Sequence, residues 1–118
     1  MIPLFEMYPN LKKNIPFISL GKFPTPVEKM NNLGKELGLD NLFVKRDDLS
    51  SDLYGGNKVR KLEFLLADAI NTKAKSVLTF GCAGSNHALA TSIYAKKLGL
   101  KAQCLCTQSE SRSRSNGS

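Results

Sequence analysis

The sequence predicts an α/β fold in which helices flank a parallel sheet, and two observations carry this prediction. Short apolar runs that end near Arg46, at 76–80 and at 101–106 alternate with two segments of helical periodicity, at 59–70 and 88–98. The order is therefore strand, helix, strand, helix, strand, with short connections. Because strand–helix–strand crossovers are nearly always right-handed, this order favours parallel strands with helices on the faces of the sheet.

The first predicted element is a helix that begins at Thr25-Pro-Val-Glu28. This string offers a capping hydroxyl, a proline at the first helical position and a glutamate three residues after the cap. Apolar residues then recur at helical spacing, at Val27, Met30, Leu33 and Leu37, and Gly38 ends the helix. The next run, "NLFVKRDDL", turns from apolar to charged, so we expect a strand that ends near Arg46.

The remaining elements follow the same reasoning. Six apolar residues match the amphipathic template of a helix, namely Val59, Leu62, Leu65, Leu66, Ala69 and Ile70. "SVLTF" predicts a strand, "GCAGSNH" the turn after it, 88–98 a helix and "KAQCLC" a further strand. From Thr107 onward there is no apolar residue. We therefore expect residues 1–106 to form the α/β part and residues 107–118 a polar, disordered tail.

Composition bounds the class of protein and its partners. The 118 residues are 42% hydrophobic and 23% charged, which is typical of one small globular domain. The net charge is +7, yet basic residues are spread along the chain without interleaved aromatic residues or a zinc-finger pattern, so no nucleic-acid partner is predicted. No apolar run reaches about 18 residues, which predicts no membrane span. At the N-terminus the lysines follow the apolar run, the reverse of a signal peptide, so we expect a cytoplasmic protein.

The three cysteines, Cys82, Cys104 and Cys106, lack the spacing of a zinc site and have no histidine cluster beside them. Neither a metal site nor a disulfide framework is therefore predicted. Reduced, buried thiols fit a cytoplasmic chain best.

The stretch "LYGGNKVRKLE" is the first candidate site. If Asn57 caps the helix, Lys58 occupies its first position, where the helix dipole, Arg60 and Lys61 all disfavour an ammonium ion. The neutral amine that this favours can form a Schiff base with an aldehyde, and the same helix end attracts a phosphate. Pyridoxal 5′-phosphate carries both groups. The alternative is that the three cations are solvated surface charges, with Glu63 balancing Lys61.

The stretch "FGCAGSNHALA" is the second candidate site. A strand that ends in a loop of small residues and opens a helix at Ser85 presents backbone N–H groups and a hydroxyl, which suit a carboxylate. The alternative is that Ser85 is an N-cap without further function. The fingerprints of dinucleotide-binding proteins, P-loops and hydrolase elbows are not in the sequence. We interpret His87, the single histidine, as a loop or packing residue and not as a triad base.

Together these strings resemble a known family. "GGNKVRKLEFLLADA", "GSNHALATSIYAKKLGL", "FPTPVEKM" and "VKRDDL" are similar to the 1-aminocyclopropane-1-carboxylate deaminase and D-cysteine desulfhydrase family, from about Pro16 to about Leu105. The resemblance implies pyridoxal phosphate as cofactor and a fold of the tryptophan synthase β type. It also implies that the chain is an N-terminal portion, because the family's glycine-rich phosphate cup, its ring-nitrogen partner and its tyrosine lie further along a longer chain.

The resemblance assigns roles position by position. Lys58 matches the lysine that holds the cofactor and moves the substrate α-proton, and Lys61 helps to hold the phosphate. Asn86 matches the residue that hydrogen-bonds the cofactor's ring hydroxyl, while Ser85, with Asn86 and His87, lies at the substrate. Many members of the family have glutamine directly before the Ser-Asn pair, where this chain has Gly84. We therefore expect its substrate contacts at this position to differ from theirs.

The implied reaction converts a small amino acid to a 2-oxo acid and ammonia, in an enzyme that is a homodimer at full length. The alternative is a truncated, non-catalytic α/β fragment that binds phosphate or carboxylate.

Overall fold

The computed structural model describes residues 2–107, and the chain divides into two compact units, Met1–Ala74 and Lys75–Ser118. Within residues 2–107, no helix is both long enough and apolar enough to cross a membrane. The predicted tail at 107–118 lies outside the described residues except for Thr107, which ends a strand.

The first unit opens with two short helices that the sequence patterns did not predict. These are α1 (Pro3–Met7) and the 3-10 helix η1 (Pro9–Lys13), and each has a proline in its first turn. A proline is tolerated there because the N–H that it lacks would have no partner within the helix. Phe5 is buried and meets Phe17 edge to face at 5.8 Å, and Phe17 meets Phe64 at 5.3 Å between ring centroids. These rings tie the N-terminal segment to the long helix of the unit.

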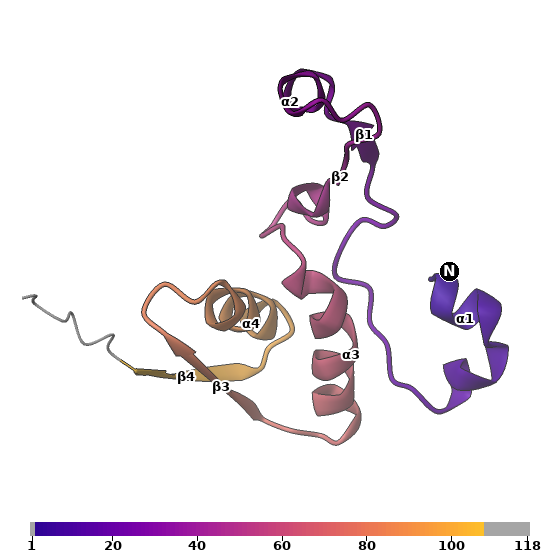
Figure 1. Ribbon diagram of the computed structural model, residues 1–118. Helices are drawn as coiled ribbons and strands as arrows, with labels where there is room; N and C mark the ends of the chain where they lie inside the picture. Colours follow the sequence, from indigo (N-terminus) through magenta and orange to yellow (C-terminus); the bar gives the residue numbers. More distant parts are fainter. Residues whose placement is uncertain (1, 108–118) are drawn as a thin grey trace, which may run out of the picture. The chain divides into compact units, whose positions relative to one another are not determined.

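The predicted helix at Thr25–Leu37 is wrong in its first part. Residues Val27–Lys29 form strand β1, which pairs antiparallel with β2 (Phe43–Lys45), and helix α2 begins only at Asn31 and ends at Leu37 (Figure 1). Gly38 does end the helix, with φ of +67°, a conformation that favours glycine. The predicted strand near Arg46 is therefore present, but it belongs to a separate antiparallel pair and not to the parallel sheet.

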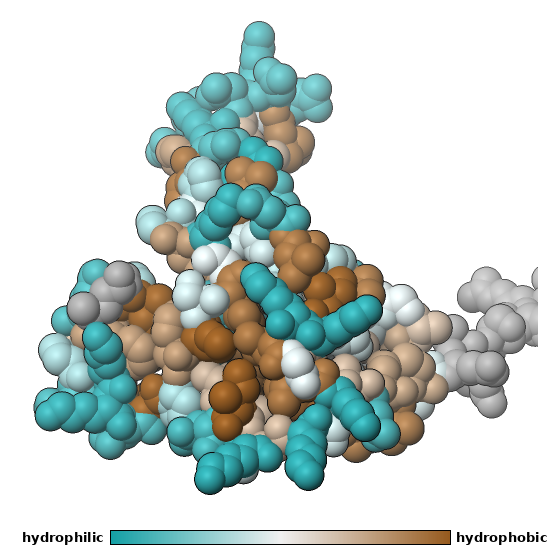
Figure 2. Space-filling model, turned by 180° about the vertical axis from the view of Figure 1, so that it is seen from behind, coloured by the Kyte–Doolittle hydropathy of each residue, from teal (hydrophilic) through white to brown (hydrophobic). Residues whose placement is uncertain are grey.

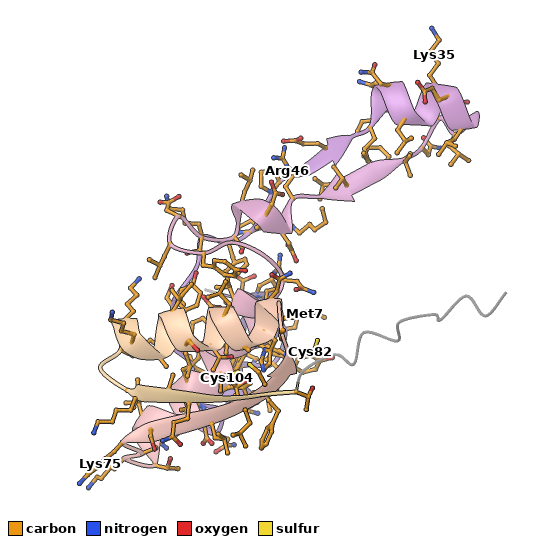
Figure 3. All side chains as sticks on the ribbon, turned by 90° about the vertical axis from the view of Figure 1, so that its left-hand side faces the viewer. Met7, Lys35, Arg46, Lys75, Cys82 and Cys104 are labelled. Atoms are coloured by element: carbon orange, nitrogen blue, oxygen red, sulfur yellow. The ribbon has the colours of Figure 1, made fainter. Side chains whose placement is uncertain are left out.

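The β1–α2–β2 segment keeps several apolar side chains on its surface. Val27, Phe43, Leu33 and Leu37 are all exposed. In Figure 2 this segment is at the top of the view, where brown side chains lie between teal ones. Figure 3 shows Lys35 on α2, at the far end of this segment, and Arg46 directly after β2, at its base. Arg46 binds Glu28 at 2.7 Å and Asp48 at 2.9 Å, which joins the base of the segment.

Helix α3 (Lys58–Asn71) confirms the amphipathic prediction. Val59, Leu62, Leu66 and Ala67 are buried, whereas Leu65 and Ile70, which the pattern also placed on the apolar face, are exposed. Glu63 is buried beside them. One oxygen of its carboxylate accepts hydrogen bonds from the backbone N–H groups of Leu20, at 2.9 Å, and Gly21, at 3.1 Å. This carboxylate fastens segment 18–22 along the helix, where the N–H of Ile18 also binds the Glu63 carbonyl.

The second unit is a strand–helix–strand crossover, as predicted. Strands β3 (Ser76–Cys82) and β4 (Lys101–Thr107) are parallel neighbours, with Phe80 opposite Leu105, and α4 (Asn86–Lys97) connects them (Figure 1). Because side chains alternate along a strand, Val77, Thr79 and Gly81 share the face that α4 covers. Leu78, Phe80 and Leu105 lie on the other face and are exposed.

Candidate functional site

Lys58 is the first residue of α3, as the sequence predicts, and two glycines before it set the turn. A Cβ at Gly55 would lie 2.0 Å from the backbone oxygen of Asp48, so a side chain there would require the loop to move. Gly56 has φ of +116°, in the region that side chains rarely adopt. Both glycines are therefore required by the backbone that leads into Lys58.

Ser50 holds this turn in place of the predicted Asn57 cap. Asn57 stands before the helix in a helical conformation and makes no side-chain capping bond. Instead, the hydroxyl of the buried Ser50 donates to the Gly56 carbonyl at 2.8 Å and accepts from the Gly56 N–H at 3.0 Å. The same N–H also donates to the Asp47 carbonyl at 2.8 Å. The start of α3 is thus fixed from residues 47–50.

Arg60, in the first turn of the helix, makes its contacts within the protein. Its guanidinium donates to the two carboxylate oxygens of Asp47, at 2.6 and 3.1 Å, and to the Thr25 hydroxyl at 3.1 Å, and it lies 4.5 Å from the centre of the Phe23 ring. Hydrogen bonding to Arg60 lowers the pKa of Asp47, and the same bond raises the pKa of Arg60. Arg60 therefore braces the start of the helix through Asp47 and Thr25.

Lys58 and Lys61 are differently placed from Arg60. Lys58 is half-buried and Lys61 is exposed, and neither side chain makes an ion pair or hydrogen bond with another of residues 2–107. The alternative that Glu63 balances Lys61 is wrong, because Glu63 turns inward to the backbone of Leu20 and Gly21. Two amines at one helix end are thus available to a ligand with an aldehyde and a phosphate.

The bond between Arg60 and Asp47 predicts a dependence of stability on pH. A carboxyl whose folded-state pKa lies below its unfolded value of about 3.9 stabilises the fold above that pH, and the contribution is lost as pH falls through the folded-state pKa. We expect Asp47→Asn to cost about 0.5–1 kcal/mol at pH 6, the range for a partly exposed pair, and the difference from the unsubstituted chain to shrink toward pH 2.

Urea unfolding at both pH values measures this difference, and Arg60→Gln supplies the matched background. In that background the pH dependence of the Asp47→Asn effect should be clearly smaller, although the Thr25 hydroxyl and Lys45 still lower the pKa of Asp47. An equal effect with and without Arg60 would contradict the assignment.

Ser85 is the N-cap of helix α4. Its hydroxyl accepts from the Ala88 N–H at 3.3 Å, and its own N–H donates to the Cys82 carbonyl at 3.0 Å. Gly81 makes room for it, since a Cβ there would lie 2.7 Å from the Ser85 Cβ and 2.8 Å from its Oγ. Gly84 has φ of +83°. The small residues of this loop therefore place the Ser85 side chain close to the end of β3.

Asn86 and His87 are the first two residues of α4, where Asn86 is exposed and His87 half-buried. Beside them a pocket of about 340 Å³ is lined by Ser85, Ser92 and the three cysteines, with Gly84, Ala88 and Leu89. Cys82, Cys104 and Cys106 are all exposed, so the prediction of buried thiols is wrong. The sulfurs of Cys104 and Cys106 are 2.9 Å apart, and this contact raises the pKa of Cys104.

The structure thus collects the predicted residues into two groups. Lys58 and Lys61 lie in the first turn of α3, and Ser85, Asn86 and His87 lie at the start of α4, each group within its own unit. Ser50 and Asp47, which support Lys58, were not predicted from the sequence. A usable signal was there, because Asp and Ser after a strand commonly bind nearby backbone groups.

Three comparisons with known proteins bear on this site. The model of the family described as pyridoxal-phosphate dependent enzyme matches residues 18–116. A protein of Pyrococcus abyssi, provisionally named 1-aminocyclopropane-1-carboxylate deaminase, is 48% identical over 92 residues, which are 78% of this chain and 28% of the relative. D-cysteine desulfhydrase of Klebsiella pneumoniae is 46% identical over 85 residues, 72% of this chain and 26% of the relative.

A solved structure gives the same result for the fold. The crystal structure described as an ACC deaminase homologue superposes with a TM-score of 0.77 and 42% identity, over 90% of this chain and 31% of the other. This similarity confirms the predicted fold class. The chain spans about 28% of the length of the P. abyssi relative.

Proposed function

Because the chain belongs to the pyridoxal-phosphate dependent enzyme family, we propose that Lys58 is its cofactor-binding lysine and that it serves a deaminase or lyase. The proposed substrate is a small amino acid, as the names of the D-cysteine desulfhydrase and 1-aminocyclopropane-1-carboxylate deaminase relatives suggest, and the products are a 2-oxo acid and ammonia. The observation that carries the proposal is the position of Lys58 at the start of α3, behind two required glycines and without an internal ion pair among residues 2–107.

The residues present fit the cofactor's two reactive ends. An amine at the first position of a helix can react with an aldehyde, and the positive end of the same helix attracts a phosphate. Lys61, three residues further along the chain and exposed, would support the phosphate. Asn86 would hydrogen-bond the ring hydroxyl. Bound pyridoxal phosphate supplies an electron sink for the electrons released at the substrate α-carbon.

The chain's own residues would then have distinct tasks. The Lys58 amine would move a proton to and from the substrate α-carbon. The Ser85 hydroxyl would lie beside the substrate, and Asn86 and His87 would complete the contacts at the start of α4. N–H groups of the 82–86 loop would bind the substrate carboxylate, since the positive end of α4 favours an anion there. Ser92 and the three thiols of the adjoining pocket would make that side of the site more polarizable than an aliphatic wall.

A second candidate function is that of a non-catalytic module that binds phosphate or carboxylate. One observation favours it: Lys61 is exposed and makes no ion pair among residues 2–107, and the 82–86 loop opens helix α4, so both places could hold an anion without a covalent bond. This module would bind an anion near Lys61 or the 82–86 loop without attaching an aldehyde to Lys58. The two functions therefore differ in covalent chemistry at one amine.

Covalent attachment of the cofactor distinguishes the two. We expect pyridoxal phosphate, reduced in place with borohydride, to be recovered on the Lys58 peptide by mass spectrometry, and Lys58→Ala to abolish recovery. Lys61→Ala should lower the yield, because it removes one phosphate partner. Lys35→Ala, which removes an exposed lysine of α2, should leave it unchanged. Labelling spread evenly over exposed lysines, Lys35 included, would refute the role of Lys58 and favour the anion-binding module.

A further inference from the structure

A second pocket lies in the first unit, at the opposite end of α3 from Lys58. Its volume is about 450 Å³, and it is formed mainly by the segment from α1 to residue 17, with Asn71 from the last turn of the helix. Because α3 has 14 residues, its two ends are about 20 Å apart. The family match begins at residue 18, so nearly all of this lining precedes the part of the chain that carries the family pattern.

The floor of the pocket is apolar and firmly packed. Phe5 is buried, and its ring meets Phe17 edge to face at an interplanar angle of 89° and Phe64 at 6.4 Å between centroids. Ile15, which also lines the pocket, is held by a 2.8 Å hydrogen bond from its N–H to the Leu11 carbonyl. A floor of ring edges and aliphatic carbon suits an aromatic ring, which prefers edge-to-face contact.

The rim of the pocket is polar and positively charged. Lys12 and Lys13 lie in the last turn of η1, and Asn14 follows them. Both lysines are exposed, and within the described part of the chain neither is in an ion pair, whereas Lys22 of the same unit is paired with Asp52. Two uncompensated cations above an apolar floor attract a ligand with an anionic head and an apolar body.

From these contacts we propose that the pocket binds a small aromatic monocarboxylate, with the ring against Phe5 and Phe17 and the carboxylate at Lys12 and Lys13. The volume is within the range of small-molecule sites. A polyanion such as a nucleotide is a poorer match, because only two cations, Lys12 and Lys13, line the pocket. The site is independent of Lys58 and of the proposed reaction.

Titration with 3-phenylpropionate, followed by amide chemical shifts of the 118-residue chain, tests this inference. We expect shifts at residues 12–17 and at Asn71, none at residues 84–88, and clearly weaker binding of the neutral isostere 3-phenylpropionamide. Substituting both lysines, Lys12→Gln with Lys13→Gln, should weaken 3-phenylpropionate about fivefold at low salt, since each exposed ion pair contributes modestly. Binding should also weaken as salt is added.

The chain offers a matched control in Lys96 and Lys97, a second exposed pair of adjacent lysines in the last turn of a helix. Lys96→Gln with Lys97→Gln lowers the net charge equally and should leave the affinity unchanged. Equal weakening by both double substitutions, equal affinity for the amide, or shifts centred on residues 84–88 would each overturn the proposal. Failure of Lys58 to attach pyridoxal phosphate would leave it intact, so the two proposals fail separately.

Discussion

Gly55→Ala is expected to destabilise the chain by about 3 kcal/mol, toward the upper end for an overpacked position. The reason is steric: the new Cβ would lie 2.0 Å from the backbone oxygen of Asp48. A backbone oxygen cannot move away by a change of rotamer, as the end of a flexible side chain can. The loop would have to separate from residues 47–50, which also costs the bonds from Gly56 to Asp47 and Ser50.

Urea unfolding followed by circular dichroism measures the loss. Gly38→Ala is the matched control, because Gly38 has a positive φ but open space around it, so that conformational strain of about 1 kcal/mol is the expected cost. We also expect Gly55→Ala to lower the yield of cofactor attached to Lys58, since the start of α3 shifts. Equal losses of stability in the two variants would show that the close contact with Asp48 does not exist in solution.

Removal of the buried Glu63 carboxylate should have an effect of similar size. Glu63→Ala leaves the N–H groups of Leu20 and Gly21 without their acceptor, and an unsatisfied buried donor costs about 1–3 kcal/mol. With two donors affected, we expect a loss of about 3 kcal/mol in the free energy of unfolding. Segment 18–22 should also loosen from α3, seen as faster hydrogen exchange at Leu20.

Two further substitutions make this test specific. Glu63→Gln keeps an oxygen of the same shape as acceptor, so it should cost less than half as much as the alanine. Glu36→Ala removes an exposed glutamate from helix α2 and should change the free energy of unfolding by no more than about 0.5 kcal/mol. If Gln and Ala at position 63 were equally destabilising, the negative charge of Glu63 would stabilise the fold, and its hydrogen bonds to the backbone would contribute little.

The elements that the sequence predicted well are those set by local pattern. Helix α3 and the β3–α4–β4 unit follow from apolar periodicity and glycine stops, and the structure has them within a few residues of the predicted bounds. Helices α1 and η1 are five residues each, too short to show a period. No local pattern could predict them.

The main error concerns Thr25-Pro-Val-Glu28. This string has the residues of a helix N-terminus, but in the structure they bind residues distant in the sequence and do not begin a helix. The Thr25 hydroxyl donates to Asp47 at 3.0 Å and accepts from Arg60, and Val27–Lys29 pairs with a strand 14 or more residues later. Partners so distant in the sequence do not affect the spacing of apolar residues from which local structure is predicted. The role of Arg60 could not be predicted for the same reason, since it depends on Asp47, 13 positions earlier.

At the candidate site the sequence located the ends of both helices but not what supports them. Lys58 and Ser85 stand where the glycine-rich turns and the start of helical periodicity predict. Asn57 was the predicted cap, but Ser50, six residues before Gly56, fixes the turn instead. Its buried hydroxyl hydrogen-bonds both the N–H and the carbonyl of Gly56. Supporting residues of this kind become visible only when the chain is folded.

The register of the second unit sets the length of the loop that must close to pair its two strands. Ser76 pairs with Lys101 and Cys82 with Thr107, a constant separation of 25 residues in the chain, and the 12 residues of helix α4 lie within it. Closing a loop of that size costs little more than closing a shorter one, because the entropy grows only with the logarithm of its length. A helix that forms first shortens the search further. The β3–α4–β4 unit therefore closes its sheet within residues 76–107, without pairing to any strand of the first unit.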